Sequence, residues 1–428
     1  MPRSVESLHD RKAPRSRLGG ADREPVDRER VALIEEMARS AVADVNELPD
    51  ALEAEQWASG MIGMWHLRPL PGVDVDALFL PELVRLVENL GSTEALAALR
   101  ALSAVGPASY GRTVRAAADR LAALGLPEPA WAADLAGVEP VAAQLLYEQA
   151  FDDGASVMIE FASADGEPHT LVVYVDHNMG GLAKNAFVAR QTLSSVRAQF
   201  NRRGAGKVGL AFRELDLAEA RARVDAALDV LDHTYDPPVD REVRYLRALV
   251  ETRMTLLPEG GVLPEAFKEM TADERRRLVD EFLDSPEGQR WQGDEDAQDV
   301  VHAAIDFGAD YNHGGPLRWS PVVVEIFMTD WLARKVAREP EFFARVADVL
   351  QDWVTYAGHR RNVPTARLRE AVAAVKLHRK EMLDAVNDPA AWGPAKMFAI
   401  AAQEAGVDLS DPDAIGEFVE RYNEGLAA

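Results

Sequence analysis

Apolar residues recur at helical spacing along most of this 428-residue chain. Val31, Ile34 and Met37 set this period near the start. From about Phe151 the pattern changes, and Val157, Ile159 and Phe161 alternate with Met158 and Glu160. Positions three or four apart line one face of a helix, whereas alternate positions line one face of a strand. The spacing therefore predicts two helical regions on either side of a short segment that contains strands.

The middle segment predicts a small sheet with helices packed on it. Residues 157–161 and 170–175 form a predicted β-hairpin around a polar turn. A helix over 182–200, a strand over 208–212 and a helix over 217–231 are expected to follow. The predicted order is β-β-α-β-α, and the predicted fold class is α+β, mainly α, with two helical regions flanking this layer.

Changes of composition and turn signals suggest the domain boundaries. The charged, Pro- and Gly-containing residues 1–30 predict a disordered tail. We expect a helical domain at 31–150, a small α+β domain at 151–236 and a second helical domain at 237–428. Capping and turn signals predict that helical runs of the last domain begin near Arg241, Ala272, Asp296, Pro321, Glu341, Thr365, Pro394 and Asp413.

Composition excludes several classes of site and partner. The chain has 71 acidic and 47 basic side chains and a formal charge of −24, so its surface as a whole repels nucleic acid and anionic lipid. It has no cysteine, which excludes disulfides and thiolate metal sites. Without a long apolar stretch or a signal peptide, it is expected to be cytoplasmic and without membrane contact. The tail carries a weak basic patch at Arg3, Arg11, Lys12, Arg15 and Arg17. Residues 359–362 (HRRN) are also basic and are expected to complement the C-terminal end of a helix, with anion recognition as the alternative.

The strongest candidate for chemistry is the turn from Asp176 to Gly181. It is predicted to leave a strand and enter a helix, where anions and acid–base groups are often placed. His177 would act as a general base oriented by Asp176. Ligand contacts would come from Asn178, Gly180, Gly181 and Lys184. The alternative is a purely structural turn, since Asn and paired Gly are also typical turn residues.

A second candidate is the loop that joins two predicted helices at residues 306–321. Asp310, Asn312 and His313 exceed what a connector needs, whereas Ser320 followed by Pro321 is a typical helix start. If this loop faced the first turn, Asp176 and His177 would join Asp310 and His313. Such a set is sufficient for a divalent metal without thiolates, although no specific motif names one.

Glu325 lies within the apolar run 322–328 and is therefore expected to be buried. A buried carboxylate must be paired or protonated. Glu325 is either the ion-pair partner of Arg318 or a catalytic acid, and Arg318 is itself a candidate ligand-binding residue together with Asn312. The aromatic residues around Trp319 and Phe327 have helical spacing, which favours a core.

Three runs resemble those of proteins from high-GC Gram-positive bacteria for which no activity is known. They are residues 127–131 (PEPAW), 175–178 (VDHN) and 316–321 (PLRWSP). The resemblance carries over no fold, activity or residue role.

Three functions remain open from the sequence. The first is a noncatalytic cytoplasmic interaction or regulatory protein with a protein partner, because no complete catalytic motif is present. The second is a hydrolase, with or without a metal, that uses the turn at Asp176 and the loop at Asp310. The third is a nucleic-acid-associated factor acting through the basic tail.

Overall fold

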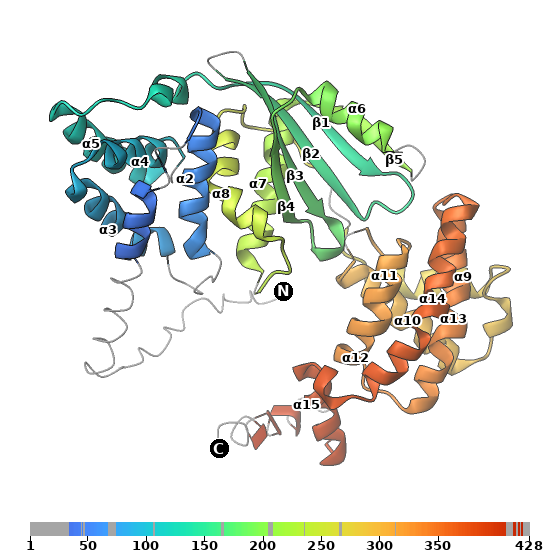
Figure 1. Cartoon of the computed structure of the whole chain (residues 1–428). Coiled ribbons are helices and arrows are strands. Elements are labelled where there is room, and N and C mark those ends of the chain that lie inside the picture. Colours follow the sequence, from blue (N-terminus) through green and yellow to red (C-terminus); the bar gives the residue numbers. More distant parts are fainter. Residues whose placement is uncertain are drawn as a thin grey trace, which may run out of the picture. The chain divides into compact units, whose positions relative to one another are not determined.

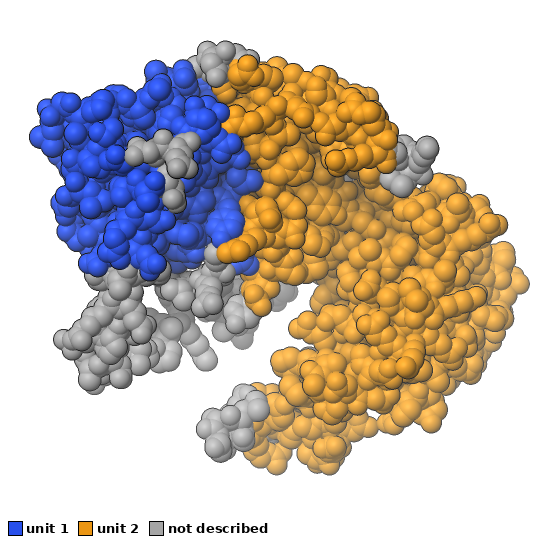
Figure 2. Space-filling model, in the orientation of Figure 1, with its two compact units in different colours: residues 1–138, 244–252 blue, residues 139–243, 253–428 orange. Residues whose placement is uncertain are grey.

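The computed structural model describes residues 34–43, 45, 48–66, 74–105, 108–163, 167–203, 209–234, 236–264, 268–312, 314–407, 414–416, 418–419 and 421–422. The predicted tail at 1–30 lies outside these residues. The chain divides into two compact units (Figure 2): unit 1 runs to Val138 and includes Arg244–Thr252, and unit 2 comprises Glu139–Val243 and Arg253–Ala428. Helices dominate and a single small sheet is present among the described residues, so the predicted mainly helical α+β class is confirmed.

Unit 1 is a helical bundle built around α4. Its helices are α2 (Ala51–His66), α3 (Val75–Leu90), α4 (Thr93–Ala104), α5 (Ala108–Ala123) and the 3-10 helix η2 (Ala130–Leu135). The core of the bundle forms where α4 packs against α2, α3 and α5. Asp74 and Ser92 cap α3 and α4 by accepting backbone N–H groups, and Gly91 ends α3 in the left-handed conformation at φ 60°.

A later helix completes this bundle. Residues 244–252 of α8 (Arg241–Thr255) belong to unit 1. The buried Ser59 hydroxyl donates to the carbonyl of Tyr245 at 2.7 Å and accepts the N–H of Leu249 at 3.0 Å. A Cβ on Gly63 would lie 2.5 Å from the carbonyl oxygen of Arg244, so only glycine lets α2 and α8 approach this closely.

Unit 2 begins with a five-stranded antiparallel sheet of order β4-β3-β2-β1-β5 (Figure 1). The strands are β1 (Glu139–Glu148), β2 (Gly154–Ala162), β3 (Pro168–Asp176), β4 (Leu182–Ala189) and β5 (Leu210–Leu215). The predicted hairpin is confirmed as β2 and β3. The predicted helix over 182–200 is wrong in its first half, because 182–189 pair with β3 and the helix α6 (Leu193–Arg202) starts only after the cap at Thr192. Together with β1, which was not predicted, the order becomes β-β-β-β-α-β-α.

One helix covers each face of this sheet. On one face, Leu193 and Val196 of α6 pack against Leu146, Met158 and Val172. The alternate strand positions face α7 (Leu217–His233), which contacts β1 to β4. The candidate site described below lies on the α7 face of the sheet.

The rest of unit 2 is helical, as predicted. Its α-helices are α9 (Ala272–Leu283), α10 (Glu295–Asp310), α11 (Pro321–Glu325), α12 (Leu332–Lys335), α13 (Pro340–Arg360), α14 (Thr365–Val386) and α15 (Pro394–Glu404). Three shorter elements are the 3-10 helices η5 (Gln289–Trp291) and η7 (Pro389–Ala391) and a π-helical turn, η6 (Ile326–Trp331). Seven of the eight expected starts lie within one residue of a helix start, that of α8 included, and the start expected near Asp413 lies outside the described residues. The start of α12 was not predicted. None of the described helices combines the length and apolarity needed to cross a membrane.

The expected aromatic core is confirmed. The ring of Phe327 is fully buried and lies with its centroid 5.2–5.4 Å from those of Phe307, Trp319 and Trp331. On α10 a Cβ added to Gly308 would lie 2.2 Å from Cα of Pro316. The loop that precedes α11 is therefore held tightly against α10.

Candidate functional site

The turn at Asp176 joins two strands. It is a short 3-10 segment, η3 (His177–Met179), followed by Gly180 and Gly181 at φ 74° and 86°. The expectation that it enters a helix is wrong, because the two left-handed glycines reverse the chain and residues 182–189 then pair with β3. No helix N-terminus is available here to bind an anion.

Asp176 stabilises this turn from a buried position. One carboxylate oxygen accepts the N–H of Asn178 at 2.9 Å, and the other lies 2.6 Å from Nζ of Lys184. Burial raises the pKa of Tyr174 to about 12, and the negative charges of Asp176 and Asp153 act in the same direction. Asp176 therefore pairs with Lys184, and it does not orient His177 as the sequence predicts.

His177 pairs with Asp152, which lies in the turn between β1 and β2. Its Nδ1 lies 3.0 Å from the carbonyl oxygen of Asp152 and 3.2 Å from the carboxylate. Burial lowers the pKa of His177, but the hydrogen bonds and negative charge of Asp152 outweigh that effect, so the net pKa is raised. Protonated His177 therefore stabilises the fold below the ordinary histidine pKa of about 6.5, and this contribution is lost as the pH rises through the folded-state pKa.

We expect the pKa of His177 to fall when Asp152 is replaced by asparagine. Asparagine tolerates the left-handed backbone of residue 152, at φ 58°, so Asp152→Asn removes the charge and keeps the turn. NMR titration of the His177 ring measures the effect. Asp330→Asn, which removes an exposed carboxylate on η6, should leave the titration unchanged. An equal pKa in the wild type and Asp152→Asn would show that Asp152 does not set it.

Arg318 joins the two loops that the sequence singles out. Its guanidinium donates to the side-chain oxygens of Asn178 at 2.8 Å, Asp153 at 3.0 Å and Asn312 at 2.9 Å. The side chain is 2% exposed. Burial lowers the pKa of Arg318 even though Asp153 and Asp152 oppose the shift. The predicted residues Asn178, Asn312 and Arg318 therefore meet at one point.

The loop around Arg318 is fixed from within. The buried Asn312 amide donates to the carbonyl of Arg318 at 2.7 Å and to that of Gly315 at 3.2 Å. A Cβ on Gly314 would lie 2.2 Å from Cδ of Arg318, so the arginine occupies the space that a side chain would need. Gly314 is therefore required for the position of Arg318.

Asp310 and Glu325, which are also predicted site residues, do not join the group around Arg318. Asp310 pairs with Arg275 and His313 lies outside the described residues. Within the described residues, no group of three or more His, Asp or Glu side chains is placed to hold a metal ion. Glu325 is exposed, so its predicted burial and its pairing with Arg318 are wrong: the residue projects from the solvent face of α11, and Arg318 pairs with Asp153.

His177 and Arg318 line a cavity of about 540 Å³ on the α7 face of the sheet. Its apolar walls come from alternate strand positions such as Leu145, Val157 and Val175, and from Ala226 and Val230 of α7. This volume lies within the range of about 300–1,000 Å³ typical of small-molecule sites.

The polar groups of this cavity carry both signs of charge. Arg213 and Arg223 both pair with Glu219, at 2.8 and 2.9 Å. The carboxylate of Glu148 accepts the backbone N–H groups of Phe151 and Asp152. A ligand with an apolar body and several hydrogen-bonding groups therefore suits the cavity better than a bare ion.

The sequence does not single out four of the polar residues in or beside this cavity, which are Asp152, Asp153, Arg213 and Arg223. The adjacent Asp152 and Asp153 follow Phe151 and are typical of any turn, which hides their pairing with His177 and Arg318. Arg213 lies on β5 and Arg223 on α7. That both lie on the same side of the sheet follows from the register of β1 with β5, which the sequence does not give.

Comparisons of this chain with protein-family models, with curated proteins and with solved structures give no significant match in any of the three. The function has to be inferred from the geometry of unit 2.

Proposed function

We propose that unit 2 binds a small molecule in the cavity between the sheet and α7, as the ligand-binding part of a noncatalytic cytoplasmic regulatory protein with a protein partner. The observation that carries the proposal is the cavity of about 540 Å³, with apolar walls and with His177 and Arg318 among its polar lining residues. The lack of cysteine is compatible with a reducing compartment such as the cytoplasm.

The fixed positions of His177 and Arg318 support binding. The guanidinium of Arg318 is fixed by the hydrogen bonds that it donates to Asn312, Asp153 and Asn178. Asp152 holds the ring of His177. Polar groups that are already oriented lose little freedom when a ligand arrives, which increases affinity.

Filling the cavity with a larger side chain should strongly reduce ligand retention. Ala226→Phe adds a ring to the α7 wall, whereas Ala116→Phe adds the same ring at an exposed position of α5. Equilibrium dialysis of the whole protein against a filtered, macromolecule-free cell extract, with mass spectrometry of the retained compounds, measures binding. We expect a compound retained by the wild type and Ala116→Phe to be at least about tenfold depleted in folded Ala226→Phe. Equal retention by all three would contradict the proposal.

Acid–base hydrolysis is a second candidate function in the same cavity. The His177–Asp152 pair favours it, because the carboxylate orients the ring and raises its pKa. His177→Gln distinguishes the two functions: a hydrolase would lose turnover of the retained compound and keep its binding, whereas a regulatory site would show no turnover in the wild type.

A further inference from the structure

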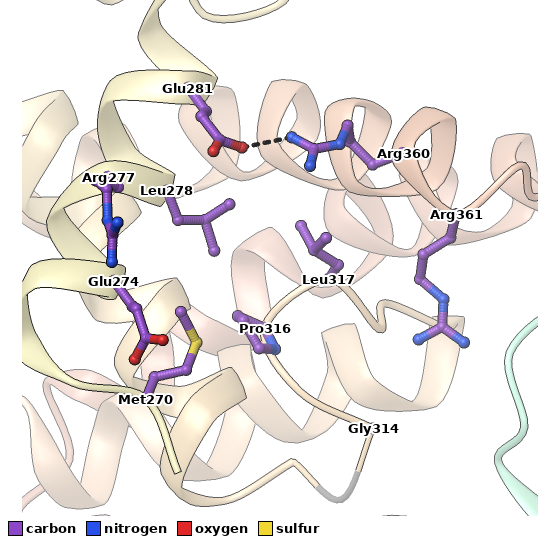
Figure 3. Close-up of a pocket in the computed structure, with 10 residues that line it drawn as sticks. All are labelled: Met270, Glu274, Arg277, Leu278, Glu281, Gly314, Pro316, Leu317, Arg360 and Arg361. Atoms are coloured by element: carbon purple, nitrogen blue, oxygen red, sulfur yellow. Dashed lines mark hydrogen bonds and ion pairs between the residues drawn. The ribbon is translucent and has the colours of Figure 1, made fainter. Parts of the chain in front are cut away.

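A second cavity, of about 520 Å³, is lined by Gly314, Pro316 and Leu317 of the loop that precedes α11 (Figure 3). Gly314 lines both cavities, while Pro316 and Leu317 face only this one. The remaining walls come from α9, from Met270 before it and from the C-terminal end of α13. This cavity belongs entirely to unit 2 and is separate from the one proposed above.

The floor of the second cavity is apolar. Figure 3 shows Leu278, Pro316 and Leu317 between Arg277 on one side and Arg361 on the other. Met270 extends the apolar surface beside Glu274. A ligand that fills this space must therefore have an apolar body.

The charged rim has an excess of positive charge. Three arginines and two glutamates line the cavity, and both glutamates already have partners. Glu281 pairs with Arg360 at 2.6 Å, and Glu274 accepts the N–H and hydroxyl groups of Thr271 in a capping box. Within the described part of the chain, no carboxylate lies within 4.0 Å of the guanidinium of Arg277 or Arg361. In a chain with a net charge of −24, two such guanidiniums beside one cavity favour an anionic ligand.

Arg361 is the better placed of the two. Arg277 lies beside Glu274 and donates to the backbone of Asp273, whereas Arg361 lies beyond Leu317, away from Glu274 (Figure 3). The acidic groups whose charge acts on Arg361 are Asp152, Asp153 and Glu148, and they already pair with His177, Arg318 and Arg367. Partial desolvation lowers the pKa of Arg361 despite those negative charges, as expected where no carboxylate pairs with it directly.

We propose that this second cavity binds an amphiphilic anion, a molecule with an apolar body over Leu278 and Leu317 and one anionic group at Arg361. An anion there gains a charge-assisted hydrogen bond that no described side chain now makes. The apolar body displaces water from the floor of the cavity.

Two dyes of nearly identical shape test the proposal on the whole protein. The probe 1-anilinonaphthalene-8-sulfonate has one anionic group, and N-phenyl-1-naphthylamine has the same ring system without it. Fluorescence titration gives the affinity of each. We expect Arg361→Gln to weaken binding of the sulfonate dye about tenfold, which is the loss of one hydrogen bond to a charged group, and to leave the neutral dye unchanged. Arg369→Gln, which removes an exposed arginine of α14, should change neither affinity by more than about twofold.

Two further variants locate the dye. Leu317→Ser should weaken both dyes, because it removes part of the apolar floor, whereas Ala226→Phe, which closes the other cavity, should weaken neither. Three results would overturn the proposal: no binding of the sulfonate dye to the folded wild type, equal effects of Arg361→Gln and Arg369→Gln, or loss of the sulfonate dye in Ala226→Phe. Because Ala226→Phe separates the cavities, this proposal can fail while the proposed function stands.

Discussion

Replacing Arg318 by methionine is expected to destabilise unit 2 by about 3–5 kcal/mol, the range for a buried charge pair that loses one partner. Methionine fills a similar volume but leaves the oxygens of Asn178, Asn312 and Asp153 without their donor. Asp153 retains 24% exposure and can partly recover its hydration, so the lower half of this range is expected. Arg318→Lys should rescue little, because an ammonium cannot reproduce the planar fork that reaches three oxygens.

Hydrogen exchange followed by mass spectrometry measures this loss within unit 2. In Arg318→Met, the protection factors of the amides of β2, β3 and α13 should fall by the factor to which the loss of free energy of unfolding converts. The double variant with Asp153→Asn should recover part of the loss, because it removes the unpaired charge. Arg369→Met, at an exposed position of α14, should change protection by no more than about 0.5 kcal/mol. Equal protection in Arg318→Met and Arg369→Met would contradict the role assigned to Arg318.

Phe327→Ala is expected to destabilise unit 2 by about 3–5 kcal/mol, as large-to-small changes at fully buried aromatic residues do. The ring contacts Phe307, Trp319 and Trp331, and its removal leaves a cavity that these large rings cannot readily fill. Exchange of the α13 and α14 amides measures the change in free energy. Val322→Ala removes a 42%-exposed side chain of α11 and should have an effect below about 0.5 kcal/mol. A similar small effect at Phe327 would mean that the core repacks around the missing ring.

Local signals in the sequence predicted much of the helical fold. Ser320 with Pro321 marks a helix start, because the cap and the first helical position depend on only a few neighbouring residues. Residues 182–189 were assigned to a helix because Leu182, Ala183 and Ala186 fit a helical face as well as a buried strand. Only pairing with β3 decides between the two, and that pairing is a tertiary contact.

The candidate site could be predicted only in part. Asn178, Asn312 and Arg318 were recognised as unusual polar residues in loops, and the structure brings them together. Asp153 was not recognised, because its pairing with Arg318 spans more than a hundred residues and leaves no local pattern. Asp152, the partner of His177, was not recognised because an aspartate is typical of any turn. Glu325 was expected to be buried from its apolar neighbours, but α11 turns it to solvent, since neighbouring positions on a helix point in different directions.

The helix that completes unit 1 also orders events during synthesis. A ribosome that has made the chain as far as Val138 has not yet made residues 244–252, and the strands of the sheet come first. Until α8 emerges, the hydroxyl of Ser59 lacks its partners at Tyr245 and Leu249, and the small surface at Gly63 stays open to water. Unit 1 therefore cannot finish folding from its N-terminal part alone, and a nascent chain that stops within the sheet presents an incomplete helical bundle to chaperones and proteases.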